Sequence, residues 1–249
     1  MNRNRKTRFV LAVGSLAACF AAGCRAPGMP GPPEVRPDQV MDFNVLYKQN
    51  CASCHGEQGH GGIAISMANP VYIAIAGEQT IARAIDEGGP GELMPAFGKK
   101  HGGFLTDAQV NALAQGIVTR WGRADALAGA TAPPDAATLA GDPAAGKAAF
   151  ATYCARCHRD TNDRNAKPRN AGPVTDPDFL ALISDQNIRS TILAGKPDEG
   201  MPDWRHLGTQ PMSDRDITDV VAWLSSLRDA AHAATPTQTS IAPQGEQKR

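Results

Sequence analysis

The sequence is poor in aromatic residues and has no excess of charge of either sign. Phe, Trp and Tyr make up 5% of its 249 residues, and 25 Lys and Arg balance 25 Asp and Glu. Proteins that bind nucleic acid need a basic patch, which this balanced composition does not indicate. Beyond the N-terminal region, no apolar run approaches the roughly 20 residues that span a membrane. We therefore expect no nucleic-acid partner and no transmembrane helix in that part of the chain.

The alternation of apolar and polar residues that is typical of half-buried strands is also missing. Apolar residues recur instead three and four positions apart, which predicts helices with one apolar face. The spacing is clearest in two segments, at Val110, Leu113, Ile117 and Trp121 and at Ile217, Val220, Val221, Leu224 and Leu227. The sequence therefore predicts an all-α fold.

The N-terminal region is the longest apolar stretch of the chain. Four of the first eight residues are basic and none is acidic, and an apolar run from Phe9 to Gly23 follows. This order is typical of a signal peptide for export. We assign residues 1–23 to the signal peptide and the Pro- and Gly-rich residues 24–37 to a flexible tether. Without the four positive charges of the signal peptide, the remaining chain is mildly acidic.

Two cysteines, Cys19 and Cys24, lie in this region, and small residues precede each of them. The pattern resembles the signals of bacterial lipoproteins, in which such a cysteine is cleaved and acylated. We favour Cys24 as the lipidated residue, because processing at Cys19 would leave a short apolar stub. The alternative is that both cysteines are small apolar residues of a removed signal. With Cys24 acylated, the protein is exported and anchored by its lipid on the periplasmic side of a membrane.

The pattern Cys-x-x-Cys-His occurs twice, at residues 51–55 and 154–158. It is typical of covalent c-type haem attachment, in which two thiols bind one porphyrin and the adjacent histidine binds the iron. The sequence therefore predicts two haem c groups per chain. The predicted attachment residues are Cys51, Cys54, Cys154 and Cys157, and the predicted proximal iron ligands are His55 and His158.

A zinc site or a dithiol redox motif would also use Cys-x-x-Cys. Neither requires the adjacent histidine, and a structural zinc takes four Cys or His ligands. Two copies of the motif 103 residues apart in an exported chain fit that requirement poorly. Haem attachment is the interpretation that we favour.

The two halves of the chain are related by an internal repeat. Residues 70–107 match residues 177–214 at a constant offset of 107, with Gly88 opposite Gly195 and Met94-Pro95 opposite Met201-Pro202. A repeat of this length predicts tandem domains and not a solenoid, whose repeats have about 20 to 50 residues. We place the first domain at residues 38–122, a linker at 123–140, the second domain at 141–231 and a disordered tail at 232–249.

Domains of this size are marginal for a core made of apolar side chains alone. The shortage of aromatic residues makes that core smaller still. A haem at the centre of each domain supplies apolar surface for the helices to cover. We therefore expect neither half to fold well without its haem.

Both halves resemble class I cytochrome c domains, and the whole chain resembles a tandem dihaem cytochrome c. The resemblance rests on the two Cys-x-x-Cys-His motifs and the two Met-Pro pairs, and it covers residues 38–122 and 141–231. It implies two helical domains, each wrapped around one covalent haem. In this family a methionine in a loop before the last helix is the distal iron ligand. Met94 and Met201 match it, 39 and 43 residues after the two histidines.

The residues themselves favour the same two methionines. A soft thioether is a natural iron ligand that raises the reduction potential when it is paired with histidine. Of the seven methionines, only Met94 and Met201 occupy equivalent positions in the repeat. We interpret Met67 and Met212, which have no matching methionine, as apolar filler.

Iron with one histidine and one methionine ligand has no open position for a substrate, which favours electron transfer over catalysis. We therefore predict an exported electron carrier and not an enzyme. Its donor is expected to be a quinol-oxidising complex or a dehydrogenase, and its acceptor a terminal oxidase or another periplasmic redox protein. Two alternatives stay open: an enzyme of the dihaem peroxidase type, and a haem subunit fixed in a larger respiratory complex.

Overall fold

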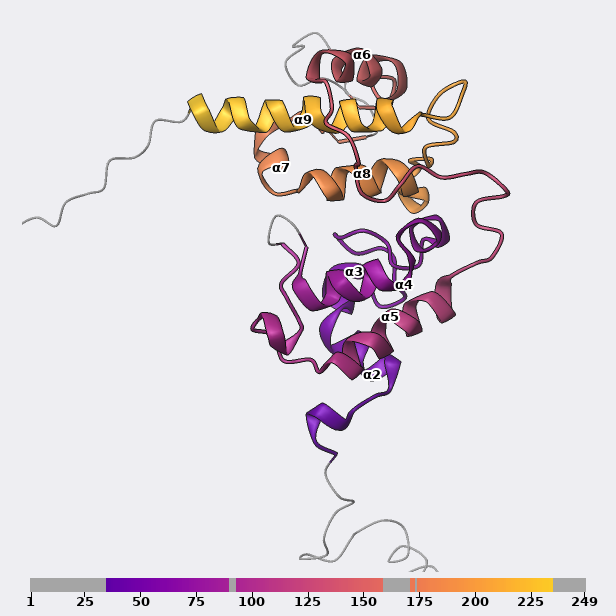
Figure 1. Ribbon diagram of the computed structural model, residues 1–249, viewed down its shortest axis with the longest axis vertical. Helices are drawn as coiled ribbons and strands as arrows, with labels where there is room; N and C mark the ends of the chain where they lie inside the picture. The colour runs from indigo at the N-terminus through magenta and orange to yellow at the C-terminus, as the bar shows by residue number, and fades with distance from the viewer. Residues whose placement is uncertain (1–34, 90–92, 159–170, 173, 235–249) are drawn as a thin grey trace, which may run out of the picture. The chain divides into compact units, whose positions relative to one another are not determined.

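The structure, a computed structural model, describes residues 35–89, 93–158, 171, 172 and 174–234 (Figure 1). Contacts divide the chain into two units, Met1–Gln39 and Val40–Arg249. The described part of the first unit contains a short 3-10 helix, η1 (Pro37–Gln39). The predicted signal peptide, most of the tether and most of the predicted tail lie outside the described residues.

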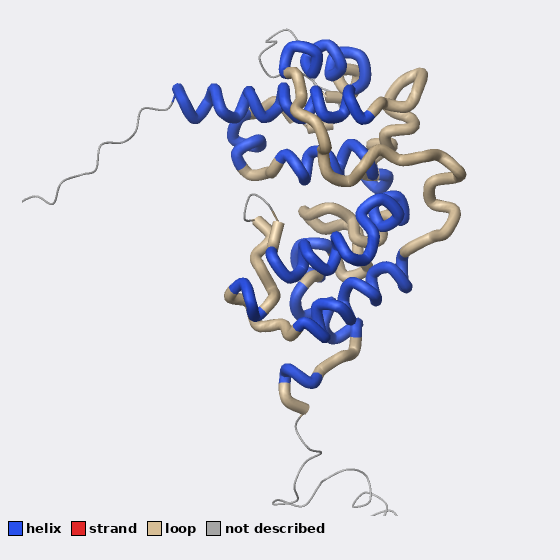
Figure 2. The backbone as a smooth tube through the Cα atoms, in the orientation of Figure 1, coloured by secondary structure: helices blue, strands red, loops and turns tan. Residues whose placement is uncertain are grey.

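All regular elements in the described part of the chain are helices, and none is a strand (Figure 2). The first half contains α2 (Phe43–Asn50), α3 (Ala52–His55), α4 (Pro70–Glu87), η2 (Lys99–His101) and α5 (Asp107–Trp121). The second half contains α6 (Pro143–Tyr153), α7 (Pro177–Ala181), α8 (Asp185–Ala194), η3 (Pro197–Glu199) and α9 (Asp214–Ala234). The predicted all-α fold is confirmed. None of the described helices combines the length and apolar character that crossing a membrane requires.

Polar residues that cap the backbone explain where the helices begin. Asp142 precedes Pro143 and accepts a hydrogen bond from the Ala144 amide at 2.8 Å, which starts α6. Proline suits the first helical position because its missing N–H has no partner there. At α5, Thr106 and Gln109 form a capping box in which each side chain accepts from the other residue's amide. These caps satisfy amides that the helix itself leaves without a partner.

Helix α4 is interrupted at Gly77, whose φ of 72° and ψ of 164° are not helical. Glycine suits this position because it has no Cβ to oppose a positive φ. At the offset of 107 residues Gly77 matches Ser184, which is the N-cap of α8. The two segments of α4 therefore correspond to α7 and α8 of the second half.

A glycine lies where the first and last helices of each half pack together. In the second half α6 packs against α9 (Figure 1), and a Cβ on Gly146 would lie 1.9 Å from the Asp219 carbonyl oxygen. In the first half α2 packs against α5, and a Cβ on Gly116 would lie 2.1 Å from the ring of Phe43. The missing side chain lets the helices approach closely in both halves.

Each half has its own core, and the predicted apolar stripes of α5 and α9 lie in these cores. Side chains from outside the second half also contribute to its core. Val71 of α4 belongs to it, and Ile75 of α4 and Leu127 of the linker pack against it. The two halves are therefore in direct contact through α4.

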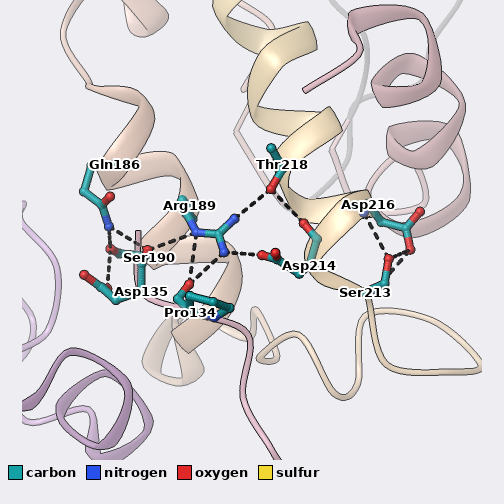
Figure 3. A network of polar contacts seen from close by, with 9 residues as sticks. All are labelled: Pro134, Asp135, Gln186, Arg189, Ser190, Ser213, Asp214, Asp216 and Thr218. Atoms are coloured by element: carbon teal, nitrogen blue, oxygen red, sulfur yellow. Dashed lines mark hydrogen bonds and ion pairs between the residues drawn. The ribbon is translucent and has the colours of Figure 1, made fainter. Parts of the chain in front are cut away.

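A buried arginine ties the linker to the second half (Figure 3). Arg189 of α8 is 2% exposed, and its guanidinium donates hydrogen bonds to the backbone carbonyls of Pro134 and Asp135. It also donates to the Thr218 hydroxyl at 3.0 Å and forms an ion pair with Asp214, both on α9. The end of the linker is thus fixed to two helices of the second half.

Candidate haem-binding sites

Each predicted attachment motif forms a single turn directly after the first helix of its domain. Cys51 is the C-cap of α2, and the His55 amide donates to the Cys51 carbonyl at 3.0 Å. Cys154 is the C-cap of α6, and the His158 amide donates to the Cys154 carbonyl at 2.9 Å. The turn places both thiols of a motif and its imidazole on one short segment, as attachment to a single porphyrin requires.

The two cysteines of each turn lie in different environments. Cys51 is half-buried and Cys154 is buried, whereas Cys54 and Cys157 are exposed. Burial raises the pKa of Cys51 to about 12, with a further contribution from Cys54, and burial and Cys157 likewise raise the pKa of Cys154 to about 12. The raised pKa values make the two inner thiols less available as thiolates, the form that zinc binding and thiol redox chemistry use. Within the described ranges, no three His, Cys, Asp or Glu side chains gather into a metal site.

The two histidines make equivalent backbone hydrogen bonds. Nδ1 of His55 lies 2.7 Å from the Ile65 carbonyl oxygen, and Nδ1 of His158 lies 3.0 Å from the Gly172 carbonyl oxygen. Ile65 and Gly172 are matched at the offset of 107 residues. An N–H on Nδ1 that donates to a carbonyl orients the ring and leaves the lone pair of Nε2 for a metal. Burial lowers the pKa of His55, which favours the neutral form that binds iron.

The two Met-Pro loops are closed by the same backbone hydrogen bond. The Gly89 amide donates to the Met94 carbonyl, and the Lys196 amide donates to the Met201 carbonyl, each at 2.9 Å. Donors and acceptors are both matched at the offset of 107 residues. The loops therefore close in the same way although their sequences differ.

A glycine with positive φ begins each Met-Pro loop. The φ angles of Gly88 and Gly195 are 84° and 68°. A Cβ on Gly88 would lie 2.7 Å from the Met94 carbonyl oxygen, and a Cβ on Gly195 would lie 2.7 Å from the Met201 carbonyl oxygen. The backbone conformation and the close approach both require glycine, which explains the identity of this position in the two halves.

The structure brings the predicted methionine and the attachment turn of each half to the same core. Met94 and Cys51 pack against the core of the first half. Met201 packs against the core of the second half, to which Cys154 belongs. Each half thus brings one thiol and one thioether to a shared core, and the second thiol and the imidazole lie on the same turn as the first thiol, a donor set that fits a covalent haem.

The remaining candidate residues fall in two groups. Met67 and Met212 are 7% and 2% exposed and are themselves part of the cores. Cys19 and Cys24, the candidate lipidation residues, lie outside the described residues. The carbonyls of Ile65 and Gly172 were not among the predicted site residues, because a backbone acceptor has no side-chain signal in the sequence.

The chain matches a known protein family in two segments. Residues 38–115 and residues 141–224 each match the family described as "Cytochrome C oxidase, cbb3-type, subunit III". Together the two segments cover more than half of the chain, which therefore belongs to this family of cytochrome c domains. Membership implies covalently bound haem c and a role in electron transfer.

Two known proteins are similar to parts of the chain. One is the "Cbb3-type cytochrome c oxidase subunit CcoP" of Azospirillum sp. (strain B510), 29% identical over 126 residues in a match that covers 46% of this chain and 38% of that protein. This chain thus matches well under half the length of that relative. A solved structure of the Kuenenia stuttgartiensis reducing HAO-like protein complex is 20% identical, with a TM-score of 0.43 over 80% of this chain and 99% of that chain. A likeness of this size carries no conclusion about function.

Proposed function

We propose that this chain is an exported electron carrier that holds two haem c groups, one in each half. His55 and Met94 are the axial ligands of the first iron, and His158 and Met201 are those of the second. The observation that carries the proposal is the turn of two cysteines and a carbonyl-bonded histidine, which occurs twice at matched positions. The similarity of the two Met-Pro loops supports the same ligation in both halves and favours a carrier over a peroxidase.

A haem iron with histidine and methionine ligands supplies reversible one-electron oxidation and reduction and has no position for a substrate. The residues of the chain hold and orient the ligands. The carbonyls of Ile65 and Gly172 keep the imidazoles in one tautomer and orientation, which also makes them better donors to iron. Gly88 and Gly195 let the Met-Pro loops close. Because all these contacts are formed in the folded chain, each ligand is held in place before an electron arrives.

Two covalent haems per chain are the first expected result. In acid-acetone extraction, about two haems per polypeptide should stay with the protein, since thioether bonds resist this treatment while non-covalent haem is removed. Replacing both Cys154 and Cys157 with Ala should leave one covalent haem, and the matched Cys51 and Cys54 double variant should also leave one. Haem lost to the solvent, or one haem per chain in the unmodified protein, would refute the proposal.

A second candidate is a haem subunit fixed in a respiratory oxidase. It is favoured by the family match and by the Azospirillum relative, both of which are described as oxidase subunits. For both candidates we propose a terminal oxidase as acceptor and a quinol-oxidising complex or a dehydrogenase as donor. Size-exclusion chromatography of gently solubilised membranes separates them, because a fixed subunit elutes with the oxidase and a carrier elutes alone.

Membrane attachment is proposed to depend on an acylated Cys24. A Cys24→Ser variant should move from the membrane fraction to the soluble periplasmic fraction, since it lacks the thiol that is acylated. Cys19→Ser is the matched control and should stay at the membrane. An unmodified N-terminus well beyond residue 24, found by mass spectrometry, would contradict the anchor and leave export intact.

A further inference from the structure

Asn69 is a buried polar residue whose side chain contacts both halves. It is 3% exposed and is the N-cap of α4, where its Oδ1 accepts from the Val71 amide at 2.9 Å and the Tyr72 amide at 3.3 Å. Its Nδ2 donates to the carbonyl oxygens of Ala194 and Gly195, at 3.0 and 3.2 Å, where α8 ends. This one side-chain amide therefore provides an acceptor for the first backbone amides of a helix in the first half and a donor for the last carbonyls of a helix in the second half.

Each side of this contact continues into a candidate ligand segment. Ile65, whose carbonyl bonds His55, lies four residues before Asn69. On the other side, Lys196 follows the acceptor carbonyls directly and exchanges two backbone hydrogen bonds with Met201, at 2.9 and 3.1 Å. A single side chain thus joins the segment that orients His55 to the loop that carries Met201.

The internal repeat shows that capping alone does not require an amide at this position. The residue matched to Asn69 is Asp176, which caps α7 by accepting from the Asp178 and Phe179 amides at 2.9 and 3.1 Å. Aspartate and asparagine cap helices about equally well, but an ionised aspartate has no hydrogen to donate. Asparagine at position 69 therefore adds a donor, and that donor is used across the halves.

The contact lies where losing a hydrogen bond is costly. The last carbonyls of a helix have no partner within the helix, and those of Ala194 and Gly195 are carried by buried residues. Val71, beside Asn69, is packed into the core of the second half and helps to keep water out. A buried carbonyl left without a donor costs more than an ordinary hydrogen bond contributes.

We propose that Asn69 is a positioning residue that holds the Met201 loop of the second half from the first half. The ordering of that loop then depends on the docking of the two halves, while the Met94 loop of the first half has no such dependence on Asn69. The spectroscopic test of this inference rests on the proposed role of Met201 as an iron ligand, whereas the hydrogen-exchange test does not.

Hydrogen exchange in the full-length haem protein tests the proposal directly. Asn69→Asp keeps the acceptor that caps α4 and replaces the donor with a carboxylate oxygen facing two carbonyls. The amides of Lys196 and Met201 should exchange about tenfold faster or more, as expected for losing a buried hydrogen bond. The Gly89 amide, which closes the Met94 loop, should exchange at its original rate.

Two further variants separate the lost donor from other effects. Asn69→Ser keeps a capping oxygen without adding charge, and it should loosen the same two amides by a smaller factor than Asn69→Asp. Asp176→Asn, the matched change in the second half, should leave all three amides unchanged. Unaltered exchange at Lys196 and Met201 in both Asn69 variants would overturn the proposal. Equal acceleration at Gly89 would also overturn it, because that result means general destabilisation.

The weak methionine-to-iron absorption at the red end of the spectrum gives a second readout. In Asn69→Asp this absorption should fall by up to half and the potential of one haem should drop, because a loosened loop holds Met201 less firmly. If the unmodified protein has no such absorption, the proposed methionine ligation fails. The exchange rates would still decide whether Asn69 orders the Met201 loop, so the two failures are distinguishable.

Discussion

Replacing Met201 with histidine should lower the reduction potential of one haem by on the order of 0.1–0.3 V and leave the other unchanged. Axial ligands tune haem potentials over about 0.8 V, and methionine paired with histidine raises the potential relative to other pairs. The same variant should lose half of the methionine-to-iron absorption. Met94→His should do the same to the other haem. A redox titration of the full-length protein, followed by absorption, measures both effects.

Two buried methionines provide matched controls. Met67→Leu and Met212→Leu conserve volume in the two cores and should change neither potential appreciably. A large shift in Met212→Leu together with none in Met201→His would show that the methionine ligand of the second half had been misassigned. The comparison is informative because Met201 and Met212 lie in the same half, but only Met201 has a matching methionine in the repeat.

Features that depend on local sequence were predictable. The two Cys-x-x-Cys-His motifs each form a single turn, as their local spacing predicted. The start of α6 at Asp142-Pro143 follows from capping chemistry alone. The constant offset of the repeat also identified Gly88 and Gly195, whose close contacts with the Met-Pro loops explain why both are glycine. In these cases each residue's role depends on near neighbours in the chain.

Features that depend on distant contacts were not predictable. A carbonyl such as that of Ile65 has no side-chain signature, so its bond to His55 could not be read from residue types. The cap at Asn69 is a local pattern, but the residues that its Nδ2 reaches lie more than 120 positions away. Arg189 departs from the rule that arginine stays at the surface. Its partners come from the linker and α9, which only the folded chain brings together.

Arg189→Met should clearly destabilise the protein although it lies outside the haem sites. The guanidinium is buried, and its loss leaves the Asp214 carboxylate without its partner and the carbonyls of Pro134 and Asp135 without their donor. Removing one partner of a fully buried ion pair typically costs about 3–5 kcal/mol. The Asp214 side chain is 30% exposed and Pro134 is exposed, so water replaces part of the lost contact and we expect a cost of about 2–3 kcal/mol. Methionine fills much of the same volume, so the loss reflects polar contacts more than packing. Denaturant unfolding of the full-length haem protein measures the change in the free energy of unfolding.

Arg215→Met is the matched control for this experiment. Arg215 also bonds a linker carbonyl, that of Ala140 at 2.9 Å, and it lies 3.7 Å from an Asp219 oxygen, but its side chain is 53% exposed. The Asp219 side chain is 6% exposed, but its carboxylate keeps the hydrogen bond that it accepts from the Asp142 amide at 2.8 Å. Ion pairs with an exposed partner at this distance contribute about 0–1 kcal/mol, so this variant should unfold almost as the unmodified protein does. A similar decrease in the free energy of unfolding in both variants would mean that the hydrogen bonds to the linker stabilise the fold and that the burial of Arg189 adds nothing. A small loss in Arg189→Met would mean that the linker is held mainly by apolar contacts such as that of Leu127. The difference in the free energy of unfolding between the two variants therefore measures how much the buried network of Arg189 fixes the linker to the second half.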